Sequence, residues 1–174
     1  MPWDRTFYSR AESKLRYRAM PVIHHAMLGA LVAIVLCAPI AAGAETRAPA
    51  EAVAMVKRVA EQLLTDGPEA TFKAVHDKST PEYHDGDLYP FIVDMNGVMM
   101  ATGSRTQLVG MSLASIKDQD GRYLIQEMIA IARNPGSGWV EYKWPNPQTN
   151  RIEGKLTYIE RVGDYFVAAG VWKH

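Results

Sequence analysis

Apolar residues between positions 50 and 65 recur every three or four residues, which is the spacing of one face of an α-helix. This face comprises Val53, Val56, Ala60, Leu63 and Leu64, whereas lysine, arginine, glutamate and glutamine occupy the other side. The pattern predicts a helix over 50–65, and Gly67 suits its C-terminal stop because glycine accepts a left-handed conformation. Pro68 and Glu69 suit a first helical turn, so a second, shorter helix is expected over 68–77.

Two apolar runs meet at Asn96-Gly97 within the stretch DLYPFIVDMNGVMMATG, residues 87–103. Asn-Gly between such runs favours a β-hairpin, because both residues tolerate the positive φ of a type I′ turn. We therefore expect two paired strands joined by this turn. The first strand has an aromatic entrance that contains Tyr89 and Phe91.

The C-terminal half of the chain predicts one more helix and three more strands. A broad apolar face indicates a helix over 118–133, with Asp120-Gly121 at its entry and a stop at Asn134-Pro135-Gly136. Alternation of apolar and polar residues then predicts strands over 139–144, 151–161 and 165–172. Because no helix separates these three strands, we expect a mainly antiparallel sheet and the fold class α+β.

The first 44 residues have the pattern of an export signal. Five basic residues precede a stretch of 19 uncharged residues over 26–44, which ends in Ala42-Gly43-Ala44. A basic start, an apolar core and a small-residue exit are the parts of a secretory signal peptide. We expect cleavage after Ala44 and a single periplasmic domain over 45–174. The alternatives are an uncleaved membrane anchor, since about 19 uncharged residues just span a bilayer, and a true start at Met20.

Removal of this leader changes the charge of the chain and its cysteine content. The whole chain has 19 basic and 19 acidic residues, and without residues 1–44 it keeps 14 and 17, a net charge of about −3. A mildly acidic domain without a basic stripe argues against nucleic-acid binding. The only cysteine, Cys37, is lost with the leader, so we expect no disulfide and no thiol chemistry.

Few residues suit catalysis or metal binding. The segment 118–121, Asp-Gln-Asp-Gly, resembles the start of a calcium loop, but Arg122 stands where the third ligand would be. A helix start charged to suit the helix dipole is the simpler interpretation. The histidines outside the leader, His76, His84 and His174, have neither metal-ligand spacing nor an acid placed to make a triad. We therefore expect neither an enzyme nor a metal or cofactor site.

Aromatic side chains are concentrated in and beside the predicted strands. They are Tyr89, Phe91, Trp139, Tyr142, Trp144 and Tyr158, and Lys155 lies among them on the fourth strand. Aromatic walls with one cation suit a small anion with an apolar tail, because the rings bury the tail and the ammonium pairs with a carboxylate. Plain core packing explains the same residue types equally well, and strict alternation places Lys155 and Tyr158 on opposite faces unless a bulge intervenes. If Lys155 does not hold the anion, Arg105 and Lys143 are the next candidate cations.

Four segments of the chain share a pattern with one known family. They are DGDLYPFIVDMNGVMMATG, LVGMSLASIKDQDGRYLIQEM, GWVEYKWPNP and KLTYIERVGDYFVAAGVW. Together they resemble the single Cache domain family of extracytoplasmic sensors, over nearly all of residues 50–173. The resemblance implies a PAS-like fold, in which a long N-terminal helix packs on a five-stranded antiparallel sheet. It also implies a small-molecule pocket beside the sheet, for which the six aromatic residues and Lys155 are the candidate ligand-binding set.

The family resemblance implies a periplasmic domain that binds a short organic acid and acts in signal transduction. Receptors of this family carry the signal through flanking transmembrane helices to methyl-accepting, kinase or cyclase modules. The sequence shows no such module after its last predicted strand, so we expect a separate membrane-bound receptor or kinase as the partner. The alternative is a ligand-free protein–protein interaction module, and the N-terminal helix is the candidate surface for docking or for a homodimer.

Overall fold

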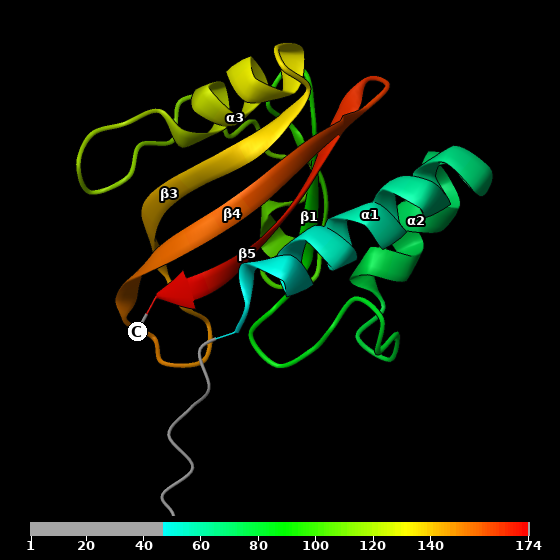
Figure 1. Cartoon of the computed structure of the whole chain (residues 1–174), viewed down its shortest axis with the longest axis horizontal. Coiled ribbons are helices and arrows are strands. Elements are labelled where there is room, and N and C mark those ends of the chain that lie inside the picture. Colours follow the sequence, from blue (N-terminus) through cyan, green and yellow to red (C-terminus); the bar gives the residue numbers. More distant parts are fainter. Residues whose placement is uncertain (1–46, 174) are drawn as a thin grey trace, which may run out of the picture. The chain divides into compact units, whose positions relative to one another are not determined.

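The computed structural model describes residues 47–173, in which two N-terminal helices, an antiparallel sheet and a third helix form the fold (Figure 1). In chain order the elements are α1 (Pro49–Thr65), α2 (Gly67–His76), β1 (Pro90–Asp94), β2 (Met99–Thr102), the 3₁₀ helix η1 (Thr106–Leu108), α3 (Leu124–Arg133), β3 (Ser137–Pro145), β4 (Ile152–Val162) and β5 (Tyr165–Lys173). This order confirms the predicted α+β class. The predicted signal peptide and its cleavage site lie outside the described residues.

The five strands form one antiparallel sheet in the order β2-β1-β5-β4-β3. The long helix α1 packs on one face across β4 and β5, whereas α3 packs against β3 and β4 (Figure 1). The pairings of β3 with β4 and of β4 with β5 run without a register shift. Side chains on these strands therefore alternate strictly between the α1 face and the α3 face.

Each face of the sheet has its own hydrophobic core. On the α1 face, Met55, Val56 and Val59 of the helix are fully buried with Ile92 of β1 and Val167 of β5. The core on the α3 face includes Phe91, Val93, Leu124, Met128, Ile159 and Phe166. Burial of a side chain of this size stabilises the fold by roughly 1.5–3 kcal/mol. Cores on both sides hold the central strands in place, which fixes the directions of the side chains that project toward α3.

Arg47 fastens the start of α1 to the loop that precedes β1. Its guanidinium donates to Asp87 Oδ1 at 2.9 Å and to the two carboxylate oxygens of Asp85 at 2.8 and 2.9 Å, and it pairs with Glu51 at 2.9 Å. The same loop is tied to the last strand, because Trp172 Nε1 donates to the carbonyl oxygen of Asp87 at 3.2 Å. Asp85 and Asp87 are thus both engaged by Arg47.

The helix α3 begins at Leu124, later than the predicted start at residue 118. Asp118 is the cause, because its Oδ1 accepts hydrogen bonds from the backbone N–H groups of Asp120 and Arg122, both at 2.9 Å. Gly121 takes a φ of +81° inside the resulting turn. When an aspartate side chain accepts hydrogen bonds from the backbone N–H groups that follow it, this arrangement competes with helix formation. Residues 118–122 therefore form a turn instead of a first helical turn.

The hairpin between β1 and β2 forms where it was predicted, but its turn is not of type I′. Gly97 has a φ of +88°, whereas Asn96 lacks the positive φ that type I′ requires of both central residues. The backbone N–H of Gly97 donates to the Asp94 carbonyl at 3.0 Å, and that of Asp94 donates to the Val98 carbonyl at 3.0 Å. This three-residue loop with a left-handed glycine at its end is typical of a G1 bulge.

Candidate ligand-binding site

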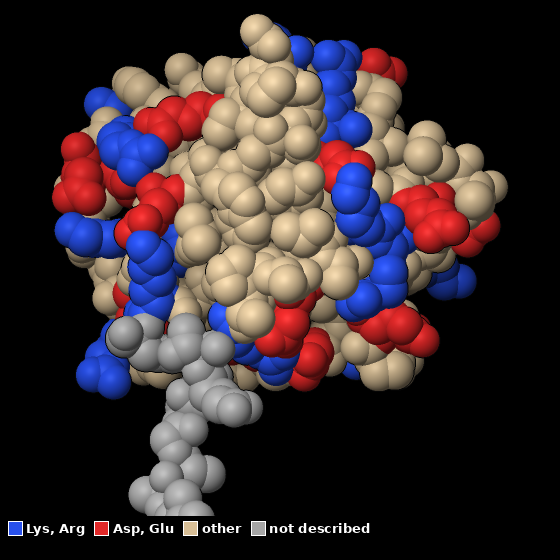
Figure 2. Space-filling model, viewed as in Figure 1, with Lys and Arg blue, Asp and Glu red and all other residues tan. Residues whose placement is uncertain are grey.

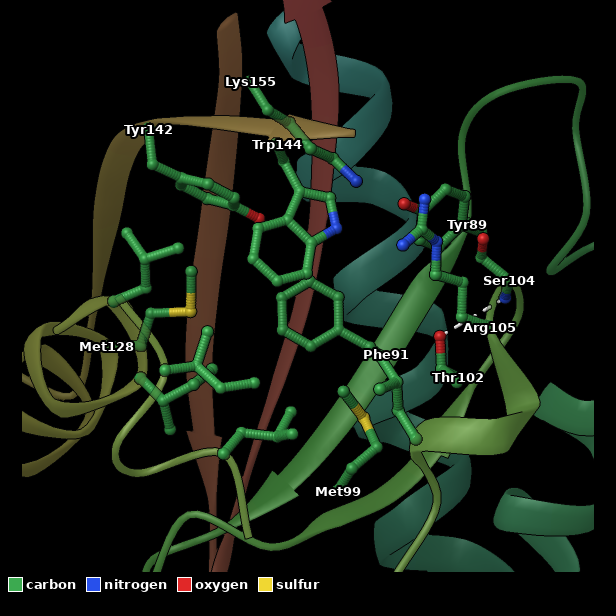
Figure 3. A pocket seen from close by; sticks show the side chains of 15 residues that line it. Tyr89, Phe91, Met99, Thr102, Ser104, Arg105, Met128, Tyr142, Trp144 and Lys155 are labelled. Atoms are coloured by element: carbon green, nitrogen blue, oxygen red, sulfur yellow. Dashed lines mark hydrogen bonds between the residues drawn. The ribbon is translucent and has the colours of Figure 1, made fainter. Parts of the chain in front are cut away.

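A small cavity lies on the α3 face of the sheet, enclosed by β1, β3 and β4, by α3 and by the segment after β2 (Figure 3). Its volume is about 50 Å³. Five of the residues selected from the sequence line it, namely Tyr89, Phe91, Tyr142, Trp144 and Lys155. Apolar side chains from β2 and α3, including Met99 and Met128, complete the wall. The cavity is therefore an apolar chamber with a few polar groups, as is usual for small-molecule sites.

Lys155 reaches this cavity because of its place on β4. It pairs in register with Tyr142 on β3 and with Trp172 on β5, so all three residues project to the α3 face. On β5, Gly170 lies opposite Thr157, and a side-chain carbon at Gly170 would stand 2.9 Å from Lys155 Cε. The absence of a side chain at Gly170 thus leaves room for the stem of Lys155 to lie across the strand.

The ammonium group of Lys155 is buried against two aromatic faces. The residue is only 1% exposed, and its Nζ lies 4.0 Å from the ring centroid of Tyr89 and 4.6 Å from that of Trp172. Among the described residues no carboxylate forms an ion pair with it. Cation–π contacts of this kind are worth about 0.5–2 kcal/mol, less than the several kcal/mol that an ammonium loses on leaving water. An anion in the cavity would supply the missing compensation.

Tyr142 adds a hydroxyl group to the same chamber. The Thr157 hydroxyl donates to Tyr142 Oη at 3.1 Å, and both side chains are buried. Burial raises the pKa of Tyr142 well above its ordinary value, and the hydrogen bond from Thr157 offsets part of this rise. The phenol therefore keeps its proton over the physiological pH range. Because Thr157 donates to this oxygen, the phenolic hydrogen is left for another acceptor.

Arg105 is a second cation at the cavity and was not in the set selected from the sequence. It follows β2, it is half-buried, and it lines the chamber together with Ser104 (Figure 3). Figure 3 shows its guanidinium beside Tyr89, at the end of the cavity where Lys155 also points. No ion pair among the described residues involves Arg105. Its position in an irregular segment gave no periodic signal, so only its charge marked it as a candidate.

Two residues of the predicted set, Trp139 and Tyr158, do not line the cavity. They face each other across β3 and β4 on the α1 side of the sheet, with ring centroids 5.1 Å apart. Strict alternation along both strands is the reason, since no bulge turns Tyr158 toward Lys155. Lys143 also alternates away from the cavity, and it pairs with Asp120 at 3.4 Å in solvent. These three residues are excluded from the cavity wall.

Charges on the surface are mixed in sign. Figure 2 shows Lys, Arg, Asp and Glu side chains interspersed around a central uncharged area, with no stripe of one sign in this view. Several of these charges neutralise each other, as Lys57 does with Glu160 at 2.6 Å and Lys173 with Glu141 at 2.5 Å. Exposed pairs of this kind contribute little to stability. The cavity, with its two cations, is thus electrostatically distinct from this surface.

The family model for single Cache domain 2 matches residues 50–168 of the chain. The chain belongs to the single Cache domain 2 family. The match includes nearly all of the two helices before the hairpin, the cavity-forming strands β1, β3 and β4, and the first part of β5, up to residue 168. The PAS-like fold expected from the sequence is therefore the fold of this Cache domain.

Known relatives of this Cache domain are sensory proteins. The methyl-accepting chemotaxis protein McpP of Pseudomonas putida is 31% identical over 91 residues, which cover 51% of this chain and 17% of McpP. The sensor histidine kinase MctS of Rhizobium johnstonii is 33% identical over 73 residues, which cover 42% of this chain and 16% of MctS. The chain spans about a sixth of the length of these curated relatives.

The fold of this Cache domain is also found among solved structures. One of them is described as the structural basis for carboxylic acid recognition by a Cache chemosensory domain. It has a TM-score of 0.58 and 21% sequence identity, and the alignment covers 70% of this chain and 85% of that one. At this identity the likeness establishes the shared fold.

The cavity of the Cache domain contains polar groups that can donate hydrogen bonds. Its polar groups are an ammonium, a guanidinium and hydroxyl groups, all of which donate hydrogen bonds to an anion. Within residues 47–173 no group of three or more His, Cys, Asp or Glu side chains is placed to hold a metal ion. Within the same range no helix is long and apolar enough to cross a membrane.

Proposed function

We propose that this Cache domain is a periplasmic sensor that binds a short-chain carboxylate, with Lys155 as the group that pairs with the carboxylate. The observation that carries the proposal is the buried ammonium of Lys155, which faces an apolar cavity between two aromatic rings. No acid within residues 47–173 forms an ion pair with it. Tyr89, Phe91, Tyr142 and Trp144 enclose the carbon chain of the ligand. Burial without a charge partner is costly, so a bound anion would relieve the site of this cost.

The size of the cavity limits the ligand. A volume of about 50 Å³ corresponds to roughly three to five water-sized groups, at about 10–15 Å³ for each group. Acids of two or three carbons, such as acetate and propionate, have about four or five non-hydrogen atoms and match this space. Longer acids would require the side chains around the cavity to move. The proposal therefore names acids of two to three carbons as the ligand class.

The proposed signalling role is inferred from the relatives of this domain. Sensory modules of this family occur in a chemotaxis receptor and in a histidine kinase, which supports a role in ligand sensing and signal transduction. We assign the output to a membrane-bound receptor or kinase that this domain contacts, with a homodimer through α1 as one arrangement. The second candidate function is a ligand-free interaction module. Leu64 on α1 is 76% exposed, and such a side chain on this helix is what a docking surface would use.

A thermal-shift experiment tests the proposal. A ligand at a hundred times its Kd that binds only the folded state adds about 2.7 kcal/mol to the free energy of unfolding. For a domain of this size about 3–5 °C of Tm corresponds to each kcal/mol, so the expected rise is roughly 10 °C. Acetate, propionate, pyruvate and lactate should be screened, with the corresponding amides as controls. An acid should raise the Tm and its amide should not, because only the acid carries the charge.

Two variants connect the shift to the cavity. Lys155→Met keeps an unbranched side chain and removes the charge, so it should abolish the shift caused by the acid. Lys143→Met removes one positive charge on the opposite face of the sheet and should leave the shift intact. A full shift in Lys155→Met would transfer the role to Arg105. If none of the acids shifts the parent protein, the ligand proposal fails and the interaction module becomes the better interpretation.

A further inference from the structure

A second, larger cavity adjoins the chamber of Lys155. Its volume is about 420 Å³, and it is lined by residues of the 78–88 loop, of the segment after β2 and of the loop between β3 and β4. Tyr89, Ser104 and Arg105 line both cavities, so these three residues form the wall between them. We call the 420 Å³ cavity the outer pocket and the 50 Å³ cavity the inner cavity.

The lining of the outer pocket has positive charge and no acid. It contains Lys78 and Arg105, together with the polar side chains of His84, Gln107 and Gln148. No ion pair among the described residues involves either cation. On a surface where acids and bases are otherwise interspersed, an acid-free hollow with two unpaired cations concentrates positive potential.

Three acids adjoin pocket-lining residues in the chain, and each accepts hydrogen bonds from a residue outside the lining. Asp77, next to Lys78, accepts from the backbone N–H and the hydroxyl of Ser79 at 2.9 and 2.7 Å. Asp85 and Asp87 flank Gly86, which lines the pocket, but both carboxylates are hydrogen bonded to Arg47. The hydrogen bonds from Arg47 also hold the pKa of Asp85 below its ordinary value. Arg47 thus offsets part of the negative charge at this rim and holds both carboxylates in hydrogen bonds of its own, and neither Lys78 nor Arg105 forms an ion pair with them.

Gly103, which lines the outer pocket, lies next to the wall between the two cavities. A side-chain carbon at this position would stand 3.0 Å from His84 Cε1 and 3.0 Å from Tyr89 Cβ. Both distances are shorter than ordinary carbon–carbon contacts, so glycine here lets the His84 loop close against Tyr89. The outer pocket is therefore set directly against the residue whose ring holds the ammonium of Lys155.

We infer that the outer pocket is a second anion-binding site, which takes small carboxylates weakly at the entrance to the inner cavity and delivers them past Arg105 to Lys155. The inference rests on the proposed function of the inner cavity. An open basic hollow raises the local concentration of anions and thereby the rate at which they enter, and salt weakens this effect. Lys78 acts on the association rate, whereas Lys155 determines how long the ligand stays.

Stopped-flow measurement of propionate binding separates these two roles. Trp144 lines the inner cavity, so tryptophan fluorescence reports its occupancy. Lys78→Gln should lower the association rate constant by about threefold at low ionic strength, and Lys78→Glu should lower it further, with the dissociation rate constant unchanged. The effect should disappear at about 0.5 M salt, where the screening length is only a few ångströms. Lys57→Gln removes the same charge from α1 on the opposite face and should leave both rate constants unchanged.

A binding measurement in Lys155→Met keeps the outer site testable by itself. Propionate at millimolar concentration should still shift the backbone amide signals of Gly86 and Ser104 in this variant, and Lys78→Gln added to it should remove the shifts. The inference fails if the parent binds propionate tightly while neither the association rate constant nor these amide signals depend on Lys78. The proposed function would remain intact in that case. In the parent protein, amide shifts at Gly86 and Ser104 without any change in tryptophan fluorescence would overturn the proposed function instead.

Discussion

Gly170→Ala adds one carbon atom where β5 lies against Thr157 and Lys155 of β4. Gly170 pairs with Thr157 across the two strands. The new Cβ would stand 2.2 Å from Thr157 Oγ1, 2.8 Å from the carbonyl oxygen of Leu156 and 2.9 Å from Lys155 Cε. The backbone oxygen cannot move without shifting the strand, whereas the lysine stem can give way. We therefore expect both a loss of stability and a displacement of Lys155.

The expected loss of stability is the difference of two effects. Overpacking a well-filled core costs about 1–3 kcal/mol. Alanine is preferred to glycine inside a strand by roughly 0.5–1 kcal/mol, which offsets part of that cost. The net loss in unfolding free energy is about 1–2 kcal/mol, which lowers the Tm by roughly 3–10 °C. Displacement of the ammonium removes a charged hydrogen bond worth about 1.5–3 kcal/mol, so the Kd for propionate should rise at least tenfold.

The assay is urea denaturation together with calorimetric titration of propionate. Gly154→Ala is the matched control, because a Cβ there would meet its nearest neighbour, Lys173 Cβ, at an ordinary 3.5 Å. This control should be as stable as the parent and bind propionate equally well. Thr157→Ala combined with Gly170→Ala removes the contact at 2.2 Å, so the double variant should lose less stability than the two single losses together. A Gly170→Ala protein with parental stability and parental Kd would refute the reasoning.

Three further outcomes are expected. Gly97→Val should lower the unfolding free energy by about 1–3 kcal/mol in urea, because a β-branched residue is strained at positive φ. Arg47→Met should destabilise the protein at neutral pH, and the difference from the parent should shrink as the pH falls below about 4. Arg47 lowers the pKa of Asp85, so this stabilisation is present above the ordinary carboxyl pKa and disappears as Asp85 is protonated. Tyr142→Phe should cost about 1–3 kcal/mol in thermal unfolding, since it leaves the buried Thr157 hydroxyl without its acceptor.

Alternation along the strands made much of the site predictable. Along β4 it places Lys155 and Tyr158 on opposite faces, as the structure has them, whereas the shared face of Lys155 and Tyr142 comes from the register between β3 and β4. Trp139 and Tyr158 were selected because they are aromatic, without regard to the face of the sheet on which they lie. The same alternation excludes both of them from the cavity. The rule that places Lys155 in the wall therefore also corrects the set that was proposed around it.

The periodic pattern of apolar residues could not predict features that depend on single side chains in irregular segments. The apolar face before residue 133 predicts a helix, but the late start of α3 depends on two hydrogen bonds that one carboxylate, Asp118, accepts from the backbone. Arg105 is similar, because its place at the cavity comes from a turn after β2 that has no period. The role of Gly170 could not be read from the sequence either, since it depends on the register between β4 and β5.

Lys155 differs from the other buried polar residues of the described chain. The buried polar residues of the described chain are Thr71, Thr102, Asn146, Lys155 and Thr157. The three threonines and the asparagine each have a hydrogen bond within the protein, whereas the ammonium of Lys155 has only ring faces. Replacement of a buried charge by an apolar side chain of similar volume is often neutral or stabilising. The fold alone therefore gives no reason for a lysine at this position, whereas the proposed anionic ligand would.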